Sequence, residues 1–76
     1  MKMYIAIDNT NGATIIALSP DKTRVSQIVQ DYLAETGGHK TWMNIHKKDD
    51  QPPTLNVFTR RDGTGELWIL EREIDE

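Results

Sequence analysis

Two segments near the start of the chain alternate between apolar and polar residues, as half-buried strands do. They span residues 3–7 and 13–18. Between them stands the pair Asn11-Gly12, which favours a two-residue type I′ turn because both residues tolerate a positive φ. The opening of the chain therefore predicts a β-hairpin.

A helix is expected directly after this hairpin. Ser19 can cap it, Pro20 suits its first turn, Asp21 suits its positive end, and Thr23 is a competing cap. The next apolar residues recur at helical spacing and form one stripe: Val25, Ile28, Val29, Tyr32 and Leu33. The pair Gly37-Gly38 is a typical helix end.

Three further strands are expected at residues 41–47, 54–60 and 66–73. A polar loop at 48–53 contains two prolines, which prevent regular strand pairing there, and residues 62–65 form a turn. The order ββαβββ predicts an α+β domain with one mostly antiparallel or mixed sheet and one helix packed on one face.

This order of a hairpin, one helix and further strands resembles the ubiquitin-like β-grasp. The final residues carry no Gly-Gly pair, so the resemblance does not imply conjugation or sulfur-carrier chemistry. We expect residues 1–76 to form a single domain in which residues 75–76 are a loose tail.

Both faces of the predicted sheet carry apolar residues, although a single helix can cover only one of them. The two-residue turn sets Ile7 opposite Ile16 and Ile5 opposite Leu18, and this register favours one set of side chains beneath the helix. That set is Met3, Ile5, Ile7, Ile16 and Leu18. The far face would then receive Tyr4, Ala6, Ile15 and Ala17.

The register of the last hairpin is left open by the sequence. A three-residue loop groups Phe58 with Trp68 and Leu70, whereas a two- or four-residue loop groups Phe58 with Leu67 and Ile69. Both alternatives leave the second face substantially apolar. Two interpretations are possible: the large residues fold over one another as core, or they form an exposed surface that binds a partner.

The second interpretation predicts a protein interface, because Trp, Tyr and Arg supply much of the binding energy at such surfaces. Its candidate partner-binding residues are Trp42, Phe58, Arg60, Trp68 and Arg72. The partner would be a host protein or a second copy of the chain as a homodimer. We therefore expect a small adaptor or inhibitor, with a phage or mobile element as the suggested source because of its size and missing catalytic motifs.

Composition narrows the function classes. The chain has 76 residues and a net charge of −3. It contains no cysteine, and this excludes disulfides, thiolate zinc sites and thiol nucleophiles. Its apolar runs are far shorter than the roughly 20 residues of a membrane span. A cytoplasmic protein without membrane contact is expected.

No arrangement of residues predicts catalysis, a cofactor or a metal site. A metal site needs three or four converging ligands. His39 and His46, with Asp49 and Asp50 nearby, would point to opposite faces of an extended segment and so do not converge unless the strand starts after His39. Single-stranded nucleic acid is the alternative partner, since residues 39–61 carry five basic and two acidic side chains interleaved with aromatics. The acidic residues after position 65 oppose that alternative.

Overall fold

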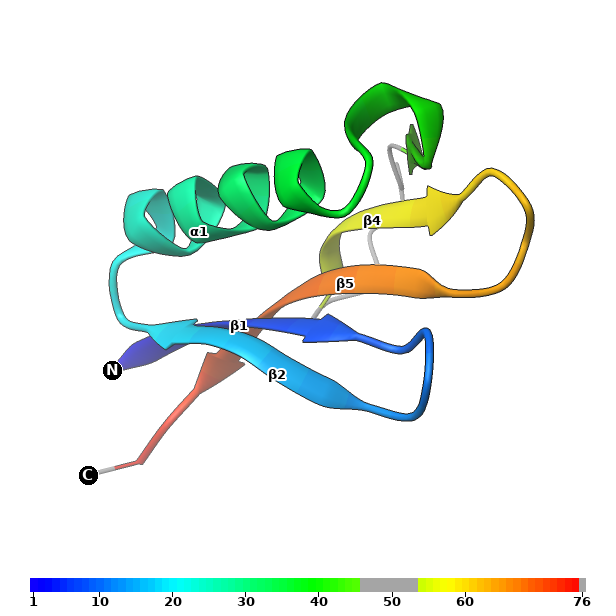
Figure 1. Ribbon diagram of the computed structural model, residues 1–76. Helices are drawn as coiled ribbons and strands as arrows, with labels where there is room; N and C mark the ends of the chain where they lie inside the picture. The colour runs from blue at the N-terminus through cyan, green and yellow to red at the C-terminus, as the bar shows by residue number, and fades with distance from the viewer. Residues whose placement is uncertain (46–53, 76) are drawn as a thin grey trace.

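The computed structural model describes residues 1–45 and 54–75, which form one five-stranded sheet with one α-helix on one face (Figure 1). The elements are β1 (Lys2–Asp8), β2 (Thr14–Ser19), α1 (Lys22–Glu35), the short 3₁₀ helix η1 (Gly38–Lys40), β3 (Trp42–Ile45), β4 (Thr54–Arg60) and β5 (Glu66–Glu73). The α+β class and the order ββαβββ are confirmed. Positions 46 and 47 of the predicted third strand lie outside the described residues.

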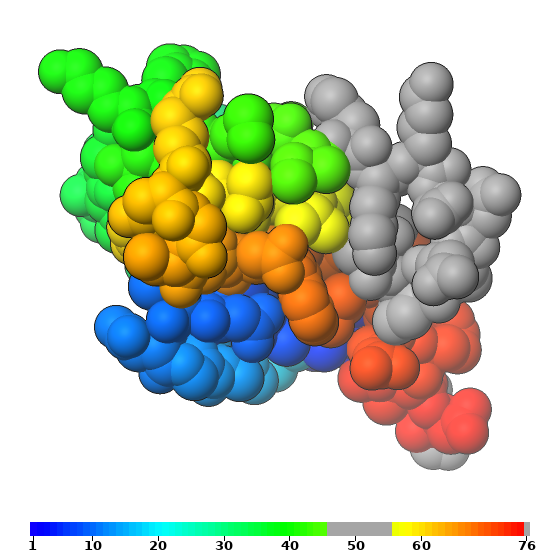
Figure 2. Space-filling model, turned by 90° about the vertical axis from the view of Figure 1, so that its right-hand side faces the viewer, coloured from blue at the N-terminus to red at the C-terminus, as the bar shows by residue number. Residues whose placement is uncertain are grey.

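The strand order is β2-β1-β5-β4-β3, and every neighbouring pair is antiparallel. The first and last strands thus lie side by side within the sheet. In Figure 2 the same order runs from the blue β1–β2 hairpin through orange β5 to yellow β4. The central β1–β5 pair is antiparallel. The sheet therefore lacks the parallel central pair of a ubiquitin-like β-grasp, and that resemblance is limited to the order of the elements.

The first hairpin forms with a register shift that the sequence did not indicate. Ile5 pairs with Leu18 as predicted, but Ile7 pairs with Ile15 because the register shifts between Ala6 and Ile7. Such a bulge adds one residue to β2 and leaves Ile16 without a partner in the ladder. The predicted pairing of Ile7 with Ile16 is therefore wrong by one residue.

Where β1 and β2 pair regularly, the helix covers the opposite face of this hairpin from the one predicted, although Ile16 packs against the helix-side cluster as predicted. Ala6 and Ala17 are buried in one cluster with Val25 and Val29 of the helix. Ile5 and Leu18 consequently point away from α1, since neighbouring side chains alternate between faces. The small side chains of the two alanines allow the helix to lie close to the sheet. The alternation of apolar and polar residues does not by itself indicate which face the helix covers.

The helix begins two residues later than the first predicted cap would place it. Asp21 is the N-cap, and its Oδ1 accepts hydrogen bonds from the amides of Thr23 at 3.0 Å and Arg24 at 3.4 Å. Ser19 instead accepts from the amide of Asp21 at 3.0 Å. The apolar stripe is confirmed, with Val25, Val29 and Leu33 buried. Gly37 comes after the helix at a φ of +117°, which favours glycine, so the predicted helix end is also confirmed.

The last hairpin adopts the second of the two registers that the sequence allows. Phe58 pairs with Leu67, and Val57 pairs with Trp68. Phe58 and Leu67 both belong to the cluster beneath α1. Trp68 therefore lies on the other face of the sheet, beside Val57.

Candidate interaction face

The five residues predicted to bind a partner divide between the two faces of the sheet. Trp42 pairs with Arg60 across β3 and β4, on the face that packs against α1. Phe58 lies on that same face, two residues before Arg60. Trp68 and Arg72 lie on the opposite face of β5. The single surface of five residues expected from the sequence therefore does not form, because the other hairpin register is the one adopted.

Trp42 and Phe58 are core residues. Their exposed fractions are 4% and 6%, and both belong to the cluster beneath the helix. The indole Nε1 of Trp42 donates a hydrogen bond to Thr36 Oγ1 at 2.8 Å. The guanidinium carbon of Arg60 lies 4.7 Å from the centre of the Trp42 ring, a cation–π distance. The first of the two sequence interpretations, core packing, is therefore the one that applies to these two aromatic side chains.

A buried carboxylate anchors the same side of the sheet. Oδ1 of Asp8 accepts hydrogen bonds from the Thr10 amide at 2.8 Å and the Thr10 hydroxyl at 2.6 Å, and Oδ2 accepts from the Tyr32 hydroxyl. Arg60 Nε in turn donates to Thr10 Oγ1 at 3.2 Å. These contacts link β1, α1 and β4, so the four side chains act together as a structural cluster.

The electrostatics of this cluster are set by its hydrogen bonds. Burial by itself would raise the pKa of Asp8, but the hydrogen bonds from Thr10 and Tyr32, together with Arg60, outweigh it and lower that pKa. The pKa of Tyr32 is raised, first by its hydrogen bond to Asp8 and then by burial. Asp8 is therefore a stable carboxylate and Tyr32 a stable phenol, an arrangement suited to holding structure together.

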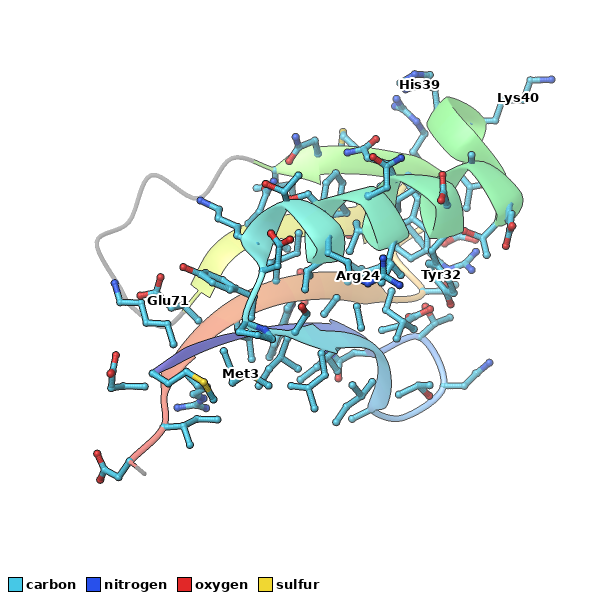
Figure 3. All side chains as sticks on the ribbon, turned by 90° about the vertical axis from the view of Figure 1, so that its left-hand side faces the viewer. Met3, Arg24, Tyr32, His39, Lys40 and Glu71 are labelled. Atoms are coloured by element: carbon cyan, nitrogen blue, oxygen red, sulfur yellow. The ribbon has the colours of Figure 1, made fainter. Side chains whose placement is uncertain are left out.

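The other face of the sheet carries one apolar row across all five strands. Successive pairings along it join the side chains of Ile15, Ile7, Trp68, Val57 and Ile45. Leu18, Ile5 and Leu70 form a second row beside the first. We call these eight residues the open face. Figure 3 shows Met3 on the same side of the sheet, away from α1.

The open face remains accessible over much of its area. Ile15 is 62% exposed, Leu18 56% and Trp68 37%, whereas Val57 and Leu70 are buried. Contiguous exposed apolar patches are uncommon on monomeric soluble proteins and mark sites of interaction. Sequence reasoning found the excess of apolar residues and placed Ile15 and Ile16 on the faces they occupy, but it assigned the paired residues Ile5, Ala6, Ala17 and Leu18 to the wrong faces. The sequence did contain one signal for the correct assignment. Ala6 and Ala17 are small residues, and small side chains allow a helix to lie close to a sheet.

A scan against protein-family models finds no match, and neither a curated protein nor a solved structure matches the chain. The assignment of a function therefore rests on the geometry of the two faces.

A cavity of about 320 Å³ lies on the helix side, between α1, η1 and β3. It is lined by the apolar residues Leu33, Trp42 and Phe58 and the polar residues Gln30, His39 and Asn44. This volume is at the lower limit of ordinary ligand pockets. His39 is the titratable residue among those that line the cavity, and no Asp, Glu, Lys or Arg side chain of the described residues lines it beside His39. We therefore assign no reaction to the cavity.

No candidate metal centre emerges within residues 1–45 and 54–75, where no three His, Cys, Asp or Glu side chains gather. His39 is exposed on η1 and extends outward beside Lys40 (Figure 3). His46, Asp49 and Asp50 lie outside the described residues. Among the helices of the described part, none is long and apolar enough to cross a membrane.

Proposed function

We propose that this chain is a small non-catalytic protein-interaction module that binds its partner through the open face. The observation that supports this proposal is the apolar row from Ile15 through Trp68 to Ile45, which no described helix covers. An adaptor or an inhibitor of another protein is the corresponding role. Trp68 is the expected anchor, because a large aromatic side chain near the centre of an apolar patch gains most from losing water.

Arg72 is the candidate for the polar rim of this interface. It lies on the open side of β5, four residues beyond Trp68, and it is exposed. Interfaces commonly place an apolar centre inside a polar rim. Arginine is enriched at interfaces relative to the rest of the protein surface. Trp42, Phe58 and Arg60 support this surface from the other side of the sheet without contacting the partner.

Nucleic acid is the less favoured partner. A sheet that binds single strands stacks bases on exposed aromatic side chains. Trp42 and Phe58 are buried, so of the three aromatic candidates Trp68 alone is exposed and available for stacking on a base. Arg72 is the basic residue that accompanies it on β5.

We expect Trp68→Ser to abolish partner capture while the domain stays folded. A hot-spot tryptophan typically contributes at least about 2 kcal/mol, so binding should weaken about 30-fold or more. The measurement is a pull-down from native extract with tagged wild type and Trp68→Ser side by side, washed at about 1 M salt, where charge interactions are screened within about 3 Å.

The matched control is Gln27→Ser, which changes an exposed position on the outer side of α1. It should capture the same partner as wild type. Equal capture by the Trp68 variant would contradict the proposal, and a nucleic acid that is lost in salt would replace it with the alternative.

A further inference from the structure

We infer that the open face binds a second copy of this chain, so that two sheets pack face to face in a symmetric dimer. This inference rests on the proposed function, because both assign the interface to the same surface. In a symmetric dimer the same patch meets itself, and it must therefore be self-complementary in shape and charge.

The first argument is the size of the sheet. Its five strands, about 4.8 Å apart, give a width of about 19 Å between the outer strands. The eight residues of β5 give it a length of about 27 Å at about 3.4 Å per residue. A face of these dimensions supplies several hundred Å² per copy, approaching the roughly 800 Å² that each partner contributes to a standard interface.

The second argument is the distribution of charge. All eight residues of the open face are uncharged, so two copies can meet across both apolar rows without opposing like charges. Two charged residues among those the structure describes flank this face on β5, with Glu66 at one end and Arg72 at the other. Both lie on the open side, because residues an even number of positions apart share a face with Trp68.

These two charges define the direction in which the second copy packs. A twofold axis that lies between the sheets, perpendicular to the strands and near Ile69, reverses β5 and places Glu66 of each copy against Arg72 of the other. The same operation places Trp68 over Leu70 of the second copy, so that a large side chain meets a smaller one, as close packing requires. Ile7 and Ile5, which pair with Trp68 and Leu70, meet in the same way.

The dimer should be detected by sedimentation equilibrium of the purified chain. We expect a mass twice the 8.7 kDa of one chain at concentrations of about 100 µM. Trp68→Ser should sediment as a monomer with an unchanged circular dichroism spectrum. A wild-type protein that stays monomeric overturns the inference, as does a dimer that persists in Trp68→Ser.

Charge reversal tests the packing direction. Glu66→Arg places like charges at both ends of the interface, and so does Arg72→Glu, so each variant alone should lose at least about tenfold in self-association. Mixed together, they should form a heterodimer, because each now complements the other. Both positions are exposed, so folding should be retained. If mixing does not restore the dimer, the antiparallel twofold arrangement is wrong.

The control variants Asp31→Arg and Arg24→Glu make the same kinds of charge reversal at exposed positions of α1 and should leave the dimer unchanged. The two proposals fail separately in these experiments. A monomeric protein that still captures another protein in a Trp68-dependent manner overturns the dimer and leaves the proposed function standing.

Discussion

Trp42→Ala should remove most or all of the stability of the domain. The side chain is 4% exposed, and truncating a buried tryptophan costs about 3–5 kcal/mol. A core in a chain of this size supplies roughly the same amount in total. The change also removes the donor to Thr36 and the ring beneath Arg60. We expect a largely unfolded protein at room temperature, measured by urea titration of the far-ultraviolet circular dichroism.

Trp68→Ala is the matched control, because it makes the same chemical change on the other face of the sheet. Trp68 is 37% exposed, so its truncation should cost the isolated chain clearly less than the truncation of Trp42. Under the proposed function it should nevertheless abolish binding. Similar losses of stability in the two variants would contradict the division into a core tryptophan and an interface tryptophan.

The helix was predictable from the sequence to within a few residues. Five apolar positions at helical spacing define its buried stripe, and the glycine pair defines its end. The cap was harder to assign, since Ser19 and Asp21 can both accept a hydrogen bond from a backbone amide two residues later. The choice between them depends on where the chain leaves β2, which is a tertiary property.

The faces of the first hairpin could not be assigned from alternation. Alternation separates two sets of side chains but does not say which set the helix covers. The larger set, with Ile5 and Leu18, was expected beneath α1, yet Ala6 and Ala17 lie there. The bulge after Ala6 adds one residue and reverses the orientation of the side chains beyond it. Ile15 and Ile16 therefore lie on the faces predicted for them, although Ile5 and Leu18 do not.

The candidate site was only half predictable for the same reason. The sequence identified Trp68 and Arg72 as surface candidates, and the structure places both on the open side of β5. It also grouped Trp42 and Phe58 with them, which required the three-residue loop in the last hairpin. The apolar row emerges only when four pairings, each set by a different turn or crossover, are known together.

Asp8→Asn should destabilise the domain at neutral pH and by much less in acid. The carboxylate accepts two hydrogen bonds from Thr10 and one from Tyr32. A hydrogen bond to a charged group contributes about 1.5–3 kcal/mol to the free energy of unfolding. An amide offers one acceptor oxygen in place of two and turns an N–H₂ group toward the remaining donors. We expect a loss of about 2–3 kcal/mol at pH 7, measured by urea unfolding.

The pH dependence identifies the charge as the cause. The folded state lowers the pKa of Asp8 below the ordinary value of about 3.9, so it binds this proton less readily than the unfolded chain does. The ionised form therefore stabilises the fold above about pH 4, and that contribution is lost as the pH falls through the lower, folded-state pKa. Wild type and Asp8→Asn should converge in stability once the pH lies below the folded-state pKa of Asp8, where both side chains are neutral. Tyr32→Phe, which removes one donor and keeps the carboxylate, should retain part of the dependence. Parallel curves for wild type and Asp8→Asn would instead show that packing around Asp8, and not its charge, joins the helix to the sheet.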